Sequence, residues 1–134
     1  MKLITRDTDY ALRAICFIAK YKKTKISVSM LVKELDIPQP FLRKILQILS
    51  KNKILKSSKG TKGGFILARD PKDIRLTDIM RIFQGDLSLN ECFLRKIVCP
   101  HTSICPLRKR IIRIENYVSK ELNSVTISSL LNQG

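Results

Sequence analysis

Apolar residues near the start of the chain recur at helical spacing. The run from 10 to 19 is mostly apolar, with Arg13 towards water, and Asp7 or Thr8 can cap the start of a helix there. The pattern predicts a core helix. Cys16 falls on its apolar side, so we expect it to be a small buried residue rather than a ligand.

Two shorter helices are predicted next, joined by a tight turn. Ser27 or Ser29 can cap the first, an Asp-Ile-Pro sequence ends it at Pro38, and Pro40 suits the first turn of the second. The second helix, over 39–53, has an apolar stripe made by Phe41, Leu42, Ile45, Leu46 and Leu49. Its free face carries Gln39, Arg43, Lys44 and Gln47. Such a pair predicts a helix-turn-helix whose second helix enters the major groove of DNA, although helix pairs also occur in other all-α proteins.

A β-hairpin is predicted after these helices. Residues 54–58 and 64–68 have strand character, and the tip between them is rich in glycine and lysine. Glycine permits positive φ and close backbone approach, while lysines can contact phosphates or a minor groove. The hairpin is therefore predicted to be a basic wing. Together with the second helix it gives a predicted DNA-binding set of Gln39, Pro40, Arg43, Lys44, Ser58, Lys59, Gly60 and Lys62.

The last third of the chain predicts further helices. Thr77 can cap a short helix over 78–83 that ends at Gly85, and 126–131 can form a final short helix. From Ile104 onwards apolar residues repeat at three, four, three and four positions on a charged helix, as in a coiled-coil seam. This narrow seam favours a two-fold partner over packing within one domain. The predicted dimerisation residues are Leu107, Ile111, Ile114 and Val118.

The charge distribution favours a polyanionic partner. Lys and Arg number 26 against 11 Asp and Glu, a net charge of +15, and no acidic residue occurs from 37 to 69. Nucleic acid is the first candidate. An anionic membrane surface is the alternative, but it requires an amphipathic helix with a large exposed apolar face, whereas the apolar residues here are assigned to a core.

Length and composition limit the other possibilities. A chain of 134 residues with 44% hydrophobic content can build one core, so we expect one domain plus an extension. No segment approaches the roughly 20 apolar residues of a membrane span, and charges interrupt any apolar run at the N-terminus. We therefore expect a cytoplasmic protein with reduced cysteines. One histidine and no paired carboxylates argue against an enzyme.

Three clustered cysteines carry the main chemistry. Cys92, Cys99 and Cys105 are separated by six and five residues, and two prolines that directly follow cysteines force the segment to loop. Such a set suits an iron–sulfur cluster with one non-cysteine ligand, or zinc held by three sulfurs and His101. A disulfide framework fits poorly because three thiols leave one over and Cys16 is distant. Three unliganded thiols remain an alternative.

Several stretches together resemble the Rrf-two (Rrf2) family of dimeric bacterial winged-helix regulators, over nearly the whole chain. They are Met1-Lys2-Leu3, Thr8-Asp9-Tyr10-Ala11-Leu12-Arg13-Ala14, Ile37-Pro38 with Phe41-Leu42-Arg43-Lys44-Ile45-Leu46, Ser57-Ser58-Lys59-Gly60 with Gly63-Gly64-Phe65-Ile66-Leu67-Ala68, and the three late cysteines. The resemblance implies that the cysteines ligate a [2Fe-2S] or [4Fe-4S] cluster and that the helix from about 104 forms the dimer.

The resemblance also bears on the fourth ligand. In one branch of the family a histidine lies three residues after the last cysteine, but here that residue is Arg108, which cannot serve. In another branch an aspartate in the first helix reaches the cluster of the partner, and Asp9 matches it. The implied fourth ligand is Asp9 of the partner subunit, with His101 as the alternative.

We therefore expect a mainly α fold with a small β-hairpin wing. The expected organisation is a winged helix-turn-helix DNA-binding domain over 1–84, a cysteine cluster-binding loop over 85–106, and a dimerisation helix with a C-terminal tail over 104–134. The expected function is that of a homodimeric repressor that binds double-stranded operator DNA and senses nitric oxide, redox or iron–sulfur status. The alternatives are a cluster-free thiol or zinc switch of the same fold, and a small iron–sulfur carrier, which would not explain the basic wing.

Overall fold

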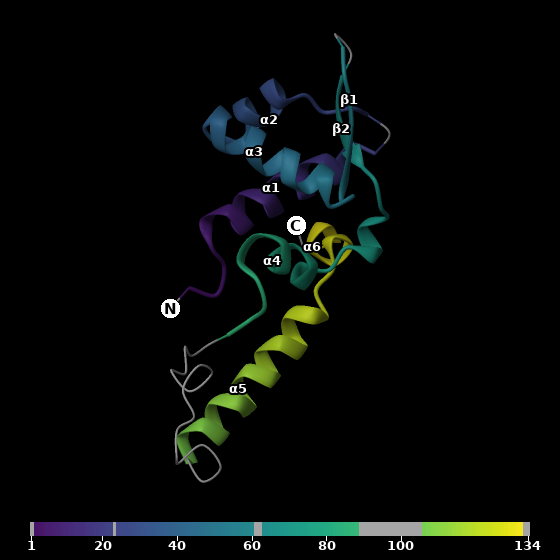
Figure 1. The fold of residues 1–134 in the computed structure, drawn as a ribbon. Coiled ribbons are helices and arrows are strands. Elements are labelled where there is room, and N and C mark those ends of the chain that lie inside the picture. The colour runs from purple at the N-terminus through teal and green to yellow at the C-terminus, as the bar shows by residue number, and fades with distance from the viewer. Residues whose placement is uncertain (1, 23, 61–62, 89–105, 133–134) are drawn as a thin grey trace.

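The computed structural model describes residues 2–22, 24–60, 63–88 and 106–132, and its described part is mainly helical with one antiparallel hairpin (Figure 1). This confirms the predicted fold class. The elements in chain order are α1 (Arg6–Lys20), α2 (Val28–Leu35), α3 (Gln39–Lys51), β1 (Leu55–Ser58), β2 (Gly64–Leu67), the 3-10 helix η1 (Pro71–Asp73), α4 (Leu76–Gln84), α5 (Pro106–Asn123) and α6 (Ile127–Asn132).

Helix α1 is the centre of the core, packed against α3, α4, α6 and β2. Most of its predicted apolar side is buried, except Tyr10, Leu12 and Cys16. The cap prediction is wrong. Thr5, rather than Asp7 or Thr8, is the cap, and its hydroxyl accepts a 3.4 Å hydrogen bond from the Thr8 amide. Cys16 packs at the edge of the core and is only partly buried.

The helix-turn-helix forms as predicted. Ser27 caps α2 by accepting from the Met30 amide at 3.2 Å, so the alternative cap Ser29 is not used. Asp36 ends α2 in the left-handed region, with φ of 53°. In α3 the apolar stripe is buried except for Phe41, whose ring is 42% exposed and lies beneath the guanidinium of Arg6. The buried members are Leu42, Ile45, Leu46 and Leu49.

The wing is a two-stranded sheet in which Leu55 pairs with Leu67 and Ser58 with Gly64. Its β2 strand also pairs with Ile26, in the loop before α2. Gly60, in the tip, has a φ of 109°, a conformation that favours glycine. The strands predicted from the sequence are therefore confirmed, each one residue shorter.

Helix α4 ends at Gly85 as predicted, with a φ of 78° at that glycine. Its start differs from the prediction because Thr77 lies inside the helix and Arg75 is the cap residue. The carboxylate of Asp78 accepts from the Arg75 amide at 3.0 Å. Thr77 instead donates its hydroxyl to the Asn123 side chain at 2.8 Å, which links α4 to the end of α5.

Helix α5 extends away from the other helices, and α6 returns to them (Figure 1). Ile127 of α6 is fully buried in the same core as α1. Its amide donates to the Ile74 carbonyl at 2.9 Å, and the Leu76 amide donates to the Val125 carbonyl at the same distance. Among the described helices, none is both long and apolar enough to cross a membrane.

Candidate nucleic-acid interface and sensor residues

The predicted base-reading residues share one exposed side of α3. Gln39, Pro40, Arg43 and Lys44 are all exposed, while the opposite side of the helix is in the core. With the Gln39 amide in the orientation that satisfies both groups, its oxygen accepts from Nη2 and Nε of Arg43 at 2.9 and 3.1 Å. A guanidinium held in this way is preorganised for planar, bidentate recognition.

The wing supplies a second basic element. Lys59 and Gly60 are exposed and Ser58 is partly exposed, while Lys62 lies outside the described residues. The hairpin projects beyond the α2 and α3 pair (Figure 1). Strand β1 contacts α3, so the wing lies beside the helix pair.

The basic charge of this region is not neutralised by ion pairs within the described part of the chain. The ion pairs found there join Arg6 to Asp7, Arg13 to Asp9 and Arg81 to Asp86, and none involves a basic residue between 37 and 69. Lysine and arginine side chains that lack internal carboxylate partners are available for phosphates.

Arg6 and Phe41 add a feature that the sequence pattern did not reveal. The guanidinium carbon of Arg6 lies 4.7 Å from the centroid of the Phe41 ring, within the range of a cation–π contact. Arg6 is in the first turn of α1 and Phe41 in the first turn of α3. The contact therefore fixes the start of α1 against the start of the recognition helix.

The predicted sensor residues are only partly described. Cys92, Cys99, Cys105 and His101 lie outside the described residues. Asp9 is in α1, its side chain is 43% exposed, and it forms a 3.1 Å ion pair with Arg13. An exposed pair of this kind contributes at most about 1 kcal/mol, so the carboxylate can exchange its partner at low cost. Its oxygens thus fit a role as an exchangeable ligand.

The described ranges contain no group of three potential metal-binding side chains. Cys16 is also unsuited to be a ligand. Burial raises the pKa of its thiol and nearby Lys20 opposes the shift only in part, so the neutral thiol is favoured.

The predicted dimerisation residues lie on an open side of α5. Leu107 is 66% exposed and Ile114 is 52% exposed, while Ile111 and Val118 are partly buried. Tyr117 and Ile112 are also exposed, and sequence reasoning missed them because they fall outside the three-four repeat. The helix thus presents an apolar surface to solvent in the single chain.

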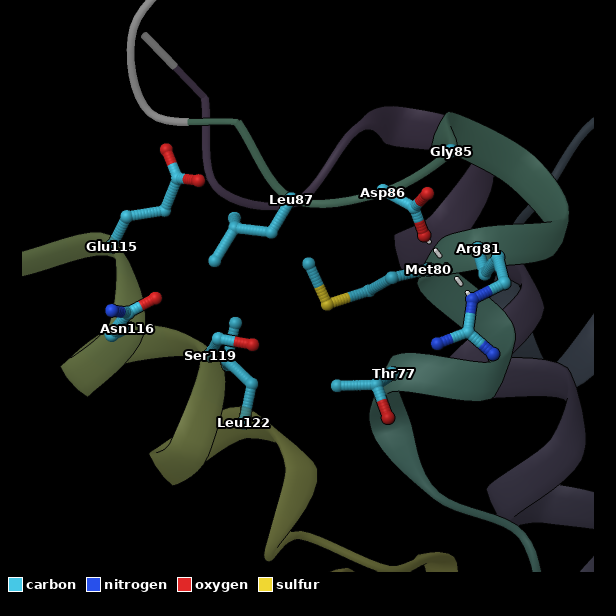
Figure 2. A pocket seen from close by; sticks show the side chains of 10 residues that line it. All are labelled: Thr77, Met80, Arg81, Gly85, Asp86, Leu87, Glu115, Asn116, Ser119 and Leu122. Carbon is cyan, nitrogen blue, oxygen red and sulfur yellow. Dashed lines mark hydrogen bonds and ion pairs between the residues drawn. The ribbon is translucent and has the colours of Figure 1, made fainter. Parts of the chain in front are cut away.

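The α4–α5 joint contains a cavity of about 170 Å³. Figure 2 shows Met80 and Leu87 on one side of it and Asn116, Ser119 and Leu122 of α5 on the other. The hydrogen bond from Thr77 to Asn123 closes one end of this joint.

The α1–α4 joint is instead tied by Gln84, the last residue of α4. Its Oε1 accepts from the Thr5 amide at 3.0 Å and from the Thr8 hydroxyl at 2.7 Å, and its Nε2 donates to the Leu3 carbonyl at 2.9 Å. Thr8 is fully buried, unlike every other polar residue in the described part of the chain. No local sequence signal identifies these contacts.

Comparison with known proteins identifies relatives over the whole chain. The profile of the Rrf2 family, described as an iron-dependent transcriptional regulator, matches residues 4–133. An HTH-type transcriptional regulator of Aquifex aeolicus is 30% identical over 133 residues, covering 97% of this chain and 92% of that protein. The NsrR regulator of Bacillus subtilis is 30% identical over 81% of this chain and 75% of its own length.

Solved structures give the same fold. CymR, the global cysteine regulator of B. subtilis, superposes with a TM-score of 0.85 at 24% identity, covering 100% of this chain and 99% of that chain. IscR of T. potens gives a TM-score of 0.77 at 22% identity, covering 99% and 88%. The relatives are transcriptional regulators rather than enzymes, as predicted, and the chain belongs to the Rrf2 family of DNA-binding transcriptional regulators.

Proposed function

We propose that this protein is a dimeric repressor whose affinity for a specific operator depends on an iron–sulfur cluster. The observation that carries the DNA-binding part is the exposed basic side formed by α3 and the wing, without internal ion pairs among its described residues. Arg43, oriented by Gln39, would read base edges, and Lys59 would contact phosphates.

The cluster would be held by Cys92, Cys99 and Cys105 of one subunit and Asp9 of the partner subunit. Three thiolates and one carboxylate are a suitable donor set, and the accessible, loosely paired Asp9 supports the choice of fourth ligand. When bound, the cluster supplies an iron with an exchangeable oxygen ligand that a small molecule such as nitric oxide can attack. If Asp9 dissociated from the cluster, its carboxylate would keep the ion pair with Arg13. The start of α1 would then no longer be attached to the partner subunit.

The dimer would form through α5. Its apolar residues Leu107, Ile112, Ile114 and Tyr117 are exposed, and burying them against a second copy removes them from water. A two-fold dimer would present two α3 helices to the two halves of an inverted repeat, about 34 Å apart.

Anaerobic purification followed by operator selection from random duplexes tests this proposal. We expect visible absorption from the purified protein, an inverted-repeat consensus, and a change in operator affinity when the cluster is removed. Colourless protein containing zinc, or protein with three free thiols that still responds to oxidants, would instead identify the thiol or zinc switch. Equal affinity for selected and random DNA would contradict sequence-specific repression.

A further inference from the structure

We propose that Gln84 is a positioning residue that couples the cysteine segment to the recognition helix through the first turn of α1. This inference rests on the proposed cluster-dependent function and names the contact that transmits the signal. Its basis is the three hydrogen bonds that one side-chain amide makes to Leu3, Thr5 and Thr8.

The chemistry of the contact requires an amide. Oε1 accepts two hydrogen bonds while Nε2 donates one, so a carboxylate would face the Leu3 carbonyl without a proton to donate. The Thr8 hydroxyl is fully buried and its one other contact is the Thr5 hydroxyl at 3.0 Å. Loss of Gln84 would leave the buried Thr8 hydroxyl with one partner instead of two and the part-buried Thr5 amide without this acceptor. The contact therefore stabilises one relative position of α4 and α1.

The contact lies between the cysteine segment, the proposed ligand Asp9 and the recognition helix. On the input side, the chain leaves α4 at Gly85, directly after Gln84, and enters the segment that carries the cysteines. On the output side, Arg6 lies between Thr5 and Thr8 and is stacked over Phe41 of α3. Asp9, the proposed ligand, follows Thr8, and its amide donates to the Thr5 carbonyl at 2.9 Å.

The opposite side of α4 is joined more loosely. An open pocket of about 170 Å³ lies between parts of α4 and α5, with Met80 and Leu87 facing Ser119 and Leu122 across it (Figure 2). Closely packed, hydrogen-bonded elements move together, whereas a cavity allows relative displacement. A displacement at residue 85 would therefore be passed from Gln84 to α1, and from Arg6 to Phe41, rather than to α5.

Two variants and a control test this role. Gln84→Met keeps a side chain of similar length without the three hydrogen bonds, and Thr8→Val removes one hydroxyl with little change in shape. The control Thr77→Val is also a threonine-to-valine substitution. It lies on α4 and removes the hydrogen bond to Asn123 of α5 instead of a contact with α1. Each protein is measured with and without its cluster for operator affinity, and without its cluster for amide hydrogen exchange.

For Gln84→Met we expect the Thr5 amide of the cluster-free protein to exchange about tenfold faster, as follows from losing one part-buried hydrogen bond. We expect the absorbance of its cluster to be unchanged. We expect the operator affinity of the cluster-loaded protein, divided by that of the cluster-free protein, to move towards one. Thr8→Val should shift the ratio in the same direction by a smaller factor. Thr77→Val should leave both the exchange and the ratio as in the wild type.

The outcomes separate the coupling role from the proposed function. A wild-type ratio of one rejects cluster-dependent binding, and with it any coupling. A wild-type ratio different from one that Gln84→Met and Thr8→Val both preserve rejects the coupling alone. Equal weakening of both states by either variant means that the contact only stabilises the fold. If Gln84→Met does not fold, the milder Thr8→Val decides between these outcomes.

Discussion

Ile26 and Phe65 exchange two backbone hydrogen bonds, of 3.0 and 2.8 Å, which attach the wing to the loop before α2. Gly64 makes this attachment possible, because a Cβ on Gly64 would lie 2.7 Å from the Ile26 carbonyl oxygen. The nearest atoms are backbone, so a side chain at this position forces the main chain to move. The orientation of the wing relative to the recognition helix therefore depends on a glycine at position 64.

Replacing this glycine should damage both stability and DNA binding. We expect Gly64→Ala to lower the free energy of unfolding by about 1–3 kcal/mol, the usual cost of forcing atoms into a packed site, and to weaken operator binding. Urea unfolding and fluorescence anisotropy measure the two effects. The control is Ser57→Ala, at an exposed position of β1 that pairs with Phe65 of β2. It should change the free energy of unfolding by less than about 0.5 kcal/mol. Equal behaviour of the two variants would contradict the role assigned to Gly64.

The wing and the recognition helix should respond differently to substitution. Lys59→Ala should weaken binding to operator and random DNA by the same factor, and should reduce the salt dependence by about one unit of slope, because one phosphate contact is lost. Arg43→Ala should instead relax base preference at one position in each half-site, with a loss of about 1–3 kcal/mol in discrimination. Lys109→Ala, exposed on α5, is the control for loss of one positive charge.

Introducing one charged side chain into α5 tests whether its exposed apolar residues form the dimer interface. Because Ile114 is 52% exposed in the single chain, Ile114→Asp should leave the fold intact. In a buried dimer seam the same charge costs several kcal/mol, so we expect monomers in sedimentation and loss of operator binding. Arg113→Asp, at the neighbouring exposed position, should remain dimeric. A dimeric Ile114→Asp protein would show that the seam lies elsewhere.

The ligand set can be tested residue by residue. Alanine at Cys92, Cys99 or Cys105 should abolish the visible absorption, whereas Cys16→Ala should retain it. Asp9→Ala should keep a cluster with an altered spectrum or altered reactivity towards nitric oxide, since the weakest ligand is replaced. If Asp9→Ala is silent and His101→Ala is not, the histidine is the ligand and the cross-subunit arrangement is wrong.

Cys16 should behave as a protected thiol. Burial raises its pKa above the ordinary 9.0, so in a variant with the three other cysteines replaced by alanine we expect alkylation at pH 8 to be slower than in urea. A raised pKa means that the folded state holds its proton more tightly than the unfolded state. The resulting stability is present below about pH 9 and is lost as pH rises through the folded pKa. Equal alkylation rates in buffer and in urea would contradict this burial effect.

The spacing of apolar residues along the sequence is enough to predict α3 and the hairpin, because in both elements the buried positions follow that spacing. The exposed side of α3 follows as well, since the free side of a helix is fixed once its buried side is known. The cap residues Thr5 and Arg75 were missed. Several Thr and Asp residues satisfy the local capping rule equally at the start of α1, and arginine is not a residue type that favours a cap. Phe41 belongs to the apolar stripe by spacing, yet its cover, Arg6, is 35 positions away in the chain.

The contacts of Gln84 show where local reasoning ends. They join residues 76, 79 and 81 positions apart, so no short window of sequence contains both partners. The α4–α5 cavity is equally non-local, because it depends on the angle at which two helices meet. The cysteines, by contrast, are found from spacing alone, although their ligand role is still a prediction.

The burial of Ile127 affects the order in which parts of the protein can fold during synthesis. The core around α1 (Arg6–Lys20) is completed by Ile127, far from α1 in the sequence, so a ribosome must release α6 before that core can close. The cysteine segment leaves the ribosome earlier, while Ile74 still lacks its backbone partner. Folding of the DNA-binding part is therefore delayed until α6 has been synthesised, and a nascent chain stopped after α5 should be sensitive to protease.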